Sequence, residues 1–487
     1  MNISVETSVN RSTTAATDET TGLSRFQQVF NRQRQLSRQT PYPSLEQRLD
    51  SLDKLENLLR DNQEAIAAAI CEDYGNRSSQ ETRLLEVYGL LSGINYTRKR
   101  IKKWMKPQKR HVGLAFWGAK NTVIPQPKGV IGIVTPWNYP LFLSLSPCIS
   151  AIAAGNRCII KLAANSQTLA RLLDELIKAQ FNDDTVAVIP GVSATEFTHQ
   201  PWDHLVFTGS PGTAVTVMET AAKTLTPVTL ELGGKSPTIV ADDFDVNTAA
   251  ERMLMGKFFN AGQTCVAPDY VFVPRSKTEE FVAAAKRIVS QRYPTAQSKD
   301  YTSIIDQKAF NRLSNTLADA KTKGANPINL LGNDPIDESN RKIPPHLVLD
   351  TTDDMMIMQD EIFGPLLPIK PYDTIDDVIA YINSHERPLA LYLYSNNKPL
   401  QDHVIYNTLS GGMCINDSVF HVAQHDMPFG GIGNSGMGHY HGPEGFNEFS
   451  KLRPIFKPGK ISGIQMMAPP YGPTFEKMYN LMVKFKL

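Results

Sequence analysis

The feature that most constrains the fold of this chain is a series of short, fully apolar runs separated by segments of helical length. Most of the gaps, such as 166–180, 213–224 and 246–260, are long enough for a helix, and the alternation resumes after residue 340 with helices expected near 374–384 and 398–407. Strands without a polar face that alternate with helices are typical of a parallel sheet covered on both faces. The sequence therefore predicts a large α/β protein with at least two βα-rich units. Its expected strands begin with VIGIV (130–134), CII (158–160), VAVI (186–189), HLVF (204–207), VTL (228–230), TIV (238–240) and YVFV (270–273).

The first hundred residues have helical spacing instead. Leucines between residues 49 and 59 follow the three-and-four pattern of an amphipathic helix, and Ser44 with Gln47 resembles a capping box at its start. The segment 98–110 has eight basic residues in thirteen. Because 50 Lys and Arg nearly balance 49 Asp and Glu over the whole chain, we interpret this segment as the solvated end of a surface helix that stops before Pro107. A nucleic-acid patch is the less favoured interpretation.

Cysteine usage indicates a reducing compartment. The chain has five cysteines, an odd number, and no CxxC pair. A disulfide framework or a structural zinc site is therefore not expected, and a cytoplasmic location fits. The first 20 residues lack the apolar run of a signal peptide, so we expect a disordered tail over 1–23. No apolar stretch is long enough to predict a membrane-spanning helix.

Three polar strings lie where an α/β protein places its ligands, at or after the ends of elements. TPWNYP (135–140) follows the strand at 130–134, LELGGKSP (230–237) ends the strand at 228–230, and FNAGQTC (259–265) follows a helix. Together they suit acyl chemistry through a thiol. Cys265 is the candidate nucleophile, Asn138 a candidate donor to an oxyanion, and Glu231 a candidate base that activates water. Taken singly, a cysteine is more often a small buried apolar residue, and an asparagine or glutamate is more often a turn or surface residue.

Two other patterns have weaker support. Gly431-Ile-Gly433-Asn-Ser-Gly436 is a literal GxGxxG, but no βαβ unit follows it, so we interpret it as a tight loop near the substrate entrance. His421 and His425 have a spacing that suits a metal on a helix. Packing or pocket lining is the preferred interpretation, and no metal site is predicted.

Taken as whole strings, these segments resemble the aldehyde dehydrogenase superfamily over residues 25–475. Further matching strings are GNRCIIK (155–161), FTGS (207–210), EIFGP (361–365) and PFGGIGNSGMG (428–438). The strings INDSVFH (415–421) and GNSGMGHYHG (433–442) resemble the class 3 branch. Among its members, KKWMKP (102–107), LTPVTLELGGKSP (225–237) and the final PPYG (469–472) are most similar to bacterial coniferyl aldehyde dehydrogenases.

The resemblance implies roles for nine residues. Cys265 matches the nucleophile, Glu231 the general base and Asn138 the oxyanion donor. The remaining matches concern the cofactor. Lys161 matches the lysine that binds the adenosine ribose, Trp137 lies in the stretch that contacts the cofactor, and Gly209 and Ser210 match the turn that approaches the pyrophosphate. Glu361 and Phe363 match the residues that hold the nicotinamide ribose and ring.

The resemblance also implies a Rossmann-like cofactor domain, an α/β catalytic domain and a small β oligomerisation arm in a homodimer. The expected boundaries are a cofactor domain over 24–112 and 131–233, a catalytic domain over 234–449, an arm from 113–130 and 450–470, and a C-terminal tail over 471–487.

Two positions depart from the family pattern on the nucleotide side. Ala164 stands where a carboxylate normally binds the ribose and repels a 2′-phosphate, and Ala214 replaces a glycine. The cofactor is thus NAD or NADP. The expected reaction is oxidation of an aromatic, coniferaldehyde-like aldehyde to its acid through a thiohemiacetal and a thioester. Long-chain aliphatic or semialdehyde substrates, an acylating relative and a non-enzymatic scaffold are the alternatives.

Overall fold

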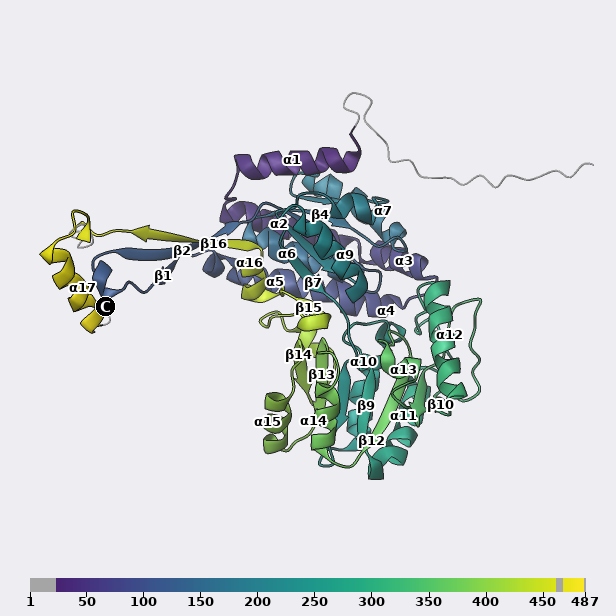
Figure 1. The fold of residues 1–487 in the computed structure, drawn as a ribbon. Coiled ribbons are helices and arrows are strands. Elements are labelled where there is room, and N and C mark those ends of the chain that lie inside the picture. The colour runs from purple at the N-terminus through teal and green to yellow at the C-terminus, as the bar shows by residue number, and fades with distance from the viewer. Residues whose placement is uncertain (1–22, 461–466, 486–487) are drawn as a thin grey trace, which may run out of the picture.

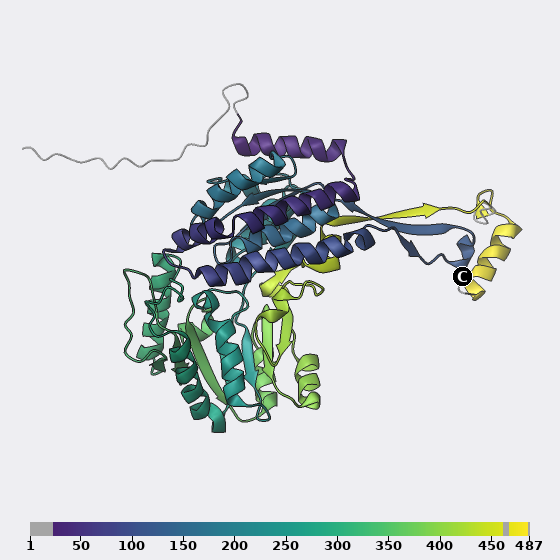
Figure 2. The same cartoon turned by 180° about the vertical axis from the view of Figure 1, so that it is seen from behind.

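The computed structural model of this protein describes residues 23–460 and 467–485. It has two α/β lobes and a narrow β arm that carries the last helix away from them (Figure 1). The view from behind shows the same division, with a layer of helices in front of the first lobe's sheet (Figure 2). The α/β prediction is confirmed. Of the tail expected over 1–23, residues 1–22 lie outside the described residues.

The helical region before the first strand agrees with the sequence pattern. Ser44 caps α2 through a capping box, because its hydroxyl accepts from the Gln47 amide while the Gln47 side chain accepts from the Ser44 amide. The basic segment ends α5 at Trp104 and then enters a short strand, as a surface helix end should. The elements here are α1 (Arg25–Gln39), α2 (Leu45–Asp61), α3 (Gln63–Tyr74), α4 (Ser79–Glu81), the π-helical η1 (Thr82–Tyr88) and α5 (Gly89–Trp104).

The first lobe is built on a six-stranded sheet of order β15-β7-β6-β3-β4-β5, parallel except for β15. The chain runs outward from β3 through β4 and β5, then returns to β6 on the other side of β3. This reversal creates a crevice at the carboxyl ends of β3 and β6. The strands are β3 (Val130–Val134), β4 (Arg157–Lys161), β5 (Val186–Val188), β6 (His204–Thr208), β7 (Val228–Glu231) and β15 (Gly436–Met437).

Both faces of this sheet are buried, as the apolar strands predicted. Ile131 and Ile133 of β3 belong to the cluster formed with α2, α3, α5, α6 and α7, whereas Val130 and Val134 pack with α1, α8 and α9. This alternation follows the two-residue period of a strand. The helices are α6 (Phe142–Ala154), α7 (Gln167–Phe181), α8 (Ala194–Thr198) and α9 (Pro211–Ala222).

The second lobe has a seven-stranded sheet of order β10-β11-β12-β9-β8-β13-β14, in which only the β10–β11 pair is antiparallel. Its strands are β8 (Pro237–Val240), β9 (Tyr270–Pro274), β10 (Asn326–Asn329), β11 (His346–Leu349), β12 (Leu366–Tyr372), β13 (Ala390–Tyr394) and β14 (Gly412–Ile415). The helices are α10 (Val246–Phe258), α11 (Thr278–Arg292), α12 (Gln307–Thr322), α13 (Met356–Gln359), α14 (Ile375–Asn383) and α15 (Lys398–Asn407).

The arm is a three-stranded antiparallel sheet of order β1-β2-β16. It joins β1 (Gln108–Arg110) and β2 (Lys120–Pro127) to β16 (Ser450–Lys457), which follows α16 (Gly442–Glu448). The segment expected to be a tail contains α17 (Pro473–Phe485), at the far end of the arm in Figure 1. In the described part of the chain, no helix has both the length and the apolar character needed to cross a membrane.

A buried ion pair fixes the start of α6, the helix that follows the TPWNYP loop. Arg77 and Glu86 are fully buried with 3.0 Å between Nη1 and Oε1. Glu86 Oε2 accepts hydrogen bonds from the Leu141 and Phe142 amides at 2.8 and 3.0 Å. A carboxylate there satisfies amides that a helix leaves unpaired at its first turn. The pair therefore connects the helical region to the loop that contains Asn138.

We predict that Arg77→Met destabilises this junction by about 3–5 kcal/mol, because it leaves the Glu86 carboxylate buried without its cation. The thermal midpoint should fall, and hydrogen exchange at the Leu141 and Phe142 amides should accelerate. Arg83→Met is the matched control, since the Arg83–Glu64 pair is solvent-exposed and should contribute less than about 1 kcal/mol. Equal effects of the two substitutions would contradict the assigned role of the buried pair.

Candidate active site

Asn138 and Glu231 lie at the same edge of the six-stranded sheet, as predicted. Asn138 is in the loop after β3, and Glu231 is the last residue of β7; β6 separates the two strands. Both side chains are buried, with exposed fractions of 3% and 2%. Asn138 Oδ1 and both Glu231 carboxylate oxygens have no hydrogen-bond partner among the described residues. Burial raises the pKa of Glu231 well above its ordinary value.

The segment before Cys265 is a kinked loop rather than a helix. Asn260 and Ala261 both adopt φ = 52°, and Gly262 follows at φ = 77°. The Asn260 amide group stabilises this rare conformation, because its Nδ2 donates to the carbonyls of Asn138 at 3.0 Å and Gln263 at 3.1 Å, and to the Tyr74 hydroxyl at 3.0 Å. The kink thus attaches the Cys265 loop directly to the Asn138 loop.

The Asn138 backbone is held from three sides. Its carbonyl accepts hydrogen bonds from the Tyr74 hydroxyl at 3.1 Å and from Arg77 Nη1 at 2.9 Å, in addition to the bond from Asn260. Next to it, the Tyr139 and Thr264 hydroxyls lie 2.8 Å apart, so residues adjacent to Asn138 and Cys265 are in contact. The structure therefore brings the loops of these two predicted residues together.

Cys265 is half-buried and unpaired. Burial raises the pKa of its thiol, and the nearby carboxylates of Glu361 and Glu231 raise it further. The same causes favour the neutral thiol over the thiolate. Glu231 is thus near enough to act electrostatically on Cys265, and the Tyr139–Thr264 contact joins the loops of Asn138 and Cys265.

Glu361 and Phe363 come from the segment between α13 and β12. The Glu361 carboxylate lies against Gly233, where an added Cβ would be 2.2 Å from Oε2. Burial, with the charge of Asp269, raises the pKa of Glu361 to about 8. Phe363 packs edge-on against Trp137, with ring centroids 5.3 Å apart. The structure thus places these three predicted cofactor residues beside the catalytic loops.

The other predicted cofactor residues lie at the crevice of the six-stranded sheet. Lys161 is the last residue of β4 and is buried, and burial lowers the pKa of its amine. Gly209 donates its amide to the Glu231 carbonyl at 3.0 Å, and Ser210 caps α9. Ala164 is exposed in the loop after Lys161, and Ala214 is buried in α9.

These residues fit a dinucleotide on physical grounds. The capped amino end of α9 at the crevice provides amides and a favourable dipole for phosphate. Lys161 provides a buried donor, and Glu361 is a buried carboxylate held close to glycine backbone, where a ribose can approach. The group they would hold accepts a hydride when bound.

The two weaker patterns have structural explanations. In the glycine-rich string, Gly436 pairs with Glu231 across β15 and β7, and the Ser435 carbonyl accepts from the Leu232 amide at 3.1 Å. The string therefore forms a tight turn, η6 (Gly433–Ser435), that leads into the edge strand beside Glu231. His421 and His425 have different surroundings: His421 Nδ1 is 3.4 Å from Cys414 Sγ. Within residues 23–460 and 467–485, no cluster of metal-binding side chains is found.

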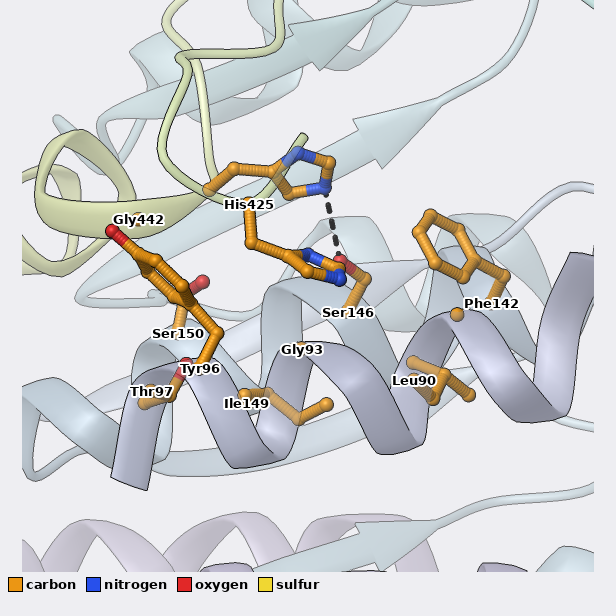
Figure 3. Close-up of a pocket in the computed structure, with 12 residues that line it drawn as sticks. Leu90, Gly93, Tyr96, Thr97, Phe142, Ser146, Ile149, Ser150, His425 and Gly442 are labelled. Atoms are coloured by element: carbon orange, nitrogen blue, oxygen red, sulfur yellow. Dashed lines mark hydrogen bonds between the residues drawn. The ribbon is translucent and has the colours of Figure 1, made fainter. Parts of the chain in front are cut away.

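His425 lines a small cavity between α5, α6 and the loop before α16 (Figure 3). Its ring lies 6.1 Å from that of His441, and His441 Nε2 is 3.2 Å from the Ser146 hydroxyl. The cavity measures about 20 Å³, which is room for one water molecule. Pocket lining, the preferred interpretation of His425, is thus what the structure shows.

Several residues that shape the site were not singled out from the sequence. Arg77, Glu86 and Asn260 hold the backbone of the catalytic loops through their hydrogen bonds. The only sequence signal was the position of Asn260 inside the string FNAGQTC.

The fold and the site define a class of protein: a two-lobed α/β enzyme that combines a dinucleotide crevice with a cysteine, a carboxylate and an amide. The aldehyde dehydrogenase family model matches residues 14–455. The chain belongs to the aldehyde dehydrogenase family and oxidises aldehydes with NAD(P).

Individual relatives agree with this assignment. A probable coniferyl aldehyde dehydrogenase of Pseudomonas aeruginosa is 47% identical over 466 residues, which cover 95% of this chain and 97% of that protein. A substrate-bound structure of Staphylococcus aureus AldH has a TM-score of 0.87 and 35% identity, covering 94% of this chain and all of that one. An aldehyde dehydrogenase of Mycobacterium tuberculosis complexed with NAD+ has a TM-score of 0.79 and 28% identity, covering 88% and 89%. The resemblance inferred from the motifs is confirmed.

We predict that Gly233→Ala weakens cofactor binding about tenfold, because the new methyl group must displace the Glu361 carboxylate and so removes about one hydrogen bond. Titration of the cofactor by fluorescence measures the effect. Gly113→Ala is the control, since no atom lies within 4 Å of its added Cβ. Unchanged affinity in Gly233→Ala would argue against a role of Glu361 in binding.

Proposed function

We propose that this enzyme oxidises an aromatic, coniferaldehyde-like aldehyde to the carboxylic acid, with Cys265, Asn138 and Glu231 as its catalytic residues. The observation that supports the mechanism is the contact between the loops of Asn138 and Cys265, through Asn260 and the Tyr139–Thr264 pair. The aromatic substrate is supported by the name of the Pseudomonas aeruginosa relative. In the corresponding domain assignment, the first lobe (24–112 and 131–233) binds the cofactor, and 234–449 completes the catalytic site.

The first half of the reaction is addition of the thiol. Cys265 attacks the aldehyde carbon and forms a thiohemiacetal, and the oxyanion lies within reach of the Asn138 side-chain amide. Because Cys265 has a raised pKa, its proton must pass to water as the carbon–sulfur bond forms. A preorganised amide in a dry site stabilises the developing negative charge more than water would. A nicotinamide cofactor held by Glu361 and Phe363 would accept the hydride, and Cys265 would then carry the acyl group as a thioester.

The second half is hydrolysis. Glu231 takes a proton from water, which attacks the thioester and releases the acid. The raised pKa of Glu231 makes it a stronger base than an exposed glutamate, although a smaller fraction is ionised at neutral pH. The presence of this base favours water over coenzyme A as the acyl acceptor.

For the cofactor we propose relaxed discrimination between NAD and NADP. The position where a carboxylate would oppose a 2′-phosphate is Ala164, which is exposed and uncharged. Lys161, three residues earlier, provides a positive charge when protonated and attracts phosphate.

We further propose a homodimer assembled through the arm. Apolar side chains are exposed on it, including Trp117 at 83% and Phe456 at 53%, and exposed apolar surface of this kind is typical of protein interfaces. A reducing compartment suits the catalytic thiol, and the cytoplasm remains our proposed location.

We predict that Cys265→Ala abolishes turnover, whereas Glu231→Gln retains a burst of NAD(P)H followed by slow acid release. Absorbance at 340 nm, measured with a panel of aromatic and aliphatic aldehydes, gives both phases and the substrate preference.

In the unmodified enzyme, hydrolysis should slow as pH falls through the raised pKa of Glu231, because only its ionised form accepts a proton. Cys71→Ala is the control. Near-normal activity in Cys265→Ala would exclude the mechanism.

We predict that Ala164→Glu lowers kcat/KM for NADP at least about tenfold, because the new carboxylate repels the 2′-phosphate, and changes kcat/KM for NAD by less than about threefold. Ala164→Gln is the control, because glutamine has the size of glutamate without its charge and should leave kcat/KM for NADP higher than Ala164→Glu does. A starting enzyme that uses NAD and leaves NADP unused would refute relaxed discrimination.

A further inference from the structure

Lys235 is a lysine in the connection between β7 and β8 to which the mechanism gives no role. It lies four residues after Glu231, and its side chain is only 16% exposed. Its Nζ donates to three acceptors, which are Asp269 Oδ2 at 2.5 Å, the Ile357 carbonyl at 2.8 Å and the Asp360 carbonyl at 2.9 Å. Because an ammonium group has three hydrogens, every donor of Lys235 is used.

The two carbonyls that Lys235 binds belong to the end of α13, the short helix that precedes Glu361. The Asp360 amide donates to the Met356 carbonyl at 3.1 Å as this helix ends. The last carbonyls of a helix have no partner within it. Lys235 supplies a partner for two carbonyls here, so it fixes the point at which the chain leaves α13 toward Glu361.

Asp269, the carboxylate partner of Lys235, holds the next part of the same segment. It is 3% exposed, and its second oxygen, Oδ1, accepts from the Ile362 amide at 2.8 Å. The Asp269 amide donates to the Ser236 carbonyl at 2.8 Å, which keeps Asp269 beside Lys235. One buried carboxylate therefore connects Lys235 to the backbone on the far side of Glu361.

Arg312 of α12 binds the segment at its other end. Its Nη2 donates to the Ile362 carbonyl at 2.7 Å and to the Phe363 carbonyl at 3.4 Å. Phe363 has φ = 45°, a left-handed conformation that is disfavoured for a residue with a side chain. The bonds from Arg312 stabilise this turn, which places the Phe363 ring edge-on against Trp137.

The segment 357–363 that these three side chains hold continues against the Cys265 loop. A Cβ added to Gly262, three residues before Cys265, would be 2.2 Å from the Gly364 carbonyl oxygen. The backbone after the segment is therefore in close contact with the loop of the proposed nucleophile. A shift of the segment would change the position of Glu361 relative to this loop.

We propose that Lys235 is a positioning residue for hydride transfer, whose ammonium holds the segment 357–363 so that Glu361 and Phe363 are presented to the nicotinamide half of the cofactor. The inference rests on the proposed function and on the roles proposed for those two residues. Lys235 acts through the backbone of the segment. It should therefore affect the steps that need the cofactor and leave the reactions of the Cys265 thiol alone.

The test is Lys235→Met, which keeps an unbranched side chain and removes its three donors. Cofactor affinity, measured by fluorescence titration, should fall roughly 10-fold, and the NAD(P)H burst at 340 nm should slow roughly 10- to 100-fold, because misplaced reactants lose rate steeply. Hydrolysis of 4-nitrophenyl acetate without cofactor, which uses the thiol but no hydride transfer, should stay within about twofold. In the cofactor-free enzyme, hydrogen exchange at the Ile362 amide should accelerate.

Lys370→Met is the matched control. The Lys370 side chain is 17% exposed and pairs with Asp353 at 2.8 Å, so its burial and its ion pair resemble those of Lys235. Among the described residues, no hydrogen bond joins Lys370 to the segment 357–363. Cofactor affinity, the burst rate and 4-nitrophenyl acetate hydrolysis should all stay within about twofold, because an ion pair with an exposed partner contributes little.

Unchanged cofactor affinity and burst rate in Lys235→Met would overturn the proposal. An equal loss of 4-nitrophenyl acetate hydrolysis would also overturn it, because that result indicates general damage to the site. If Lys235→Met fails to fold, Lys235→Gln keeps two N–H donors without the charge, and it must show the same division between cofactor-dependent and cofactor-free reactions. Failure of the underlying function has a different signature, since Cys265→Ala would then retain both 4-nitrophenyl acetate hydrolysis and NAD(P)H formation.

Discussion

The catalytic region depends on one side-chain amide, that of Asn260. This residue adopts a left-handed backbone conformation in which side chains are disfavoured, followed by a second such residue, Ala261. Its Nδ2 offsets that cost through hydrogen bonds to Tyr74, Asn138 and Gln263. Because the proposed nucleophile, Cys265, comes from the chain leaving α10 and the proposed oxyanion donor, Asn138, from the loop after β3, no single element can align them. Asn260 connects the two.

Burial is the second constraint on the site. Glu231, Cys265 and Glu361 all have raised pKa values, with desolvation as the largest cause in each case. Their charged forms are therefore disfavoured in this site. The same low dielectric strengthens the hydrogen bonds that form during the reaction. The Arg77–Glu86 ion pair supports the loop that contains Asn138 but has no proposed role in the reaction.

Much of the fold could be predicted from the sequence because its parallel strands are apolar on both faces. Each expected strand from 130 to 273 lies within two residues of an observed strand. The strand β10, with sequence NPIN, and the two-residue β15 have no such pattern. They exist because neighbouring strands offer unpaired backbone groups. Helix α17 was missed because the segment was treated as a tail.

In the candidate site, too, some residues could be predicted from the sequence and others could not. Cys265, Asn138 and Glu231 were recognisable because they occur in strings whose order resembles a known family. Asn260 was not singled out, although it lies in the string FNAGQTC. Its importance comes from contacts between segments distant in sequence, because its side chain donates to the Tyr74 hydroxyl and to the Asn138 carbonyl.

The central claim is that the acyl group is carried by the sulfur of Cys265. The most direct measurement is mass spectrometry of Glu231→Gln enzyme that has been mixed with aldehyde and cofactor, quenched in acid and digested. The account predicts one added acyl mass on the peptide containing Cys265, formed at the rate of the NAD(P)H burst. An acyl group on Cys414 or any other residue, or a burst without any acylated peptide, would contradict it.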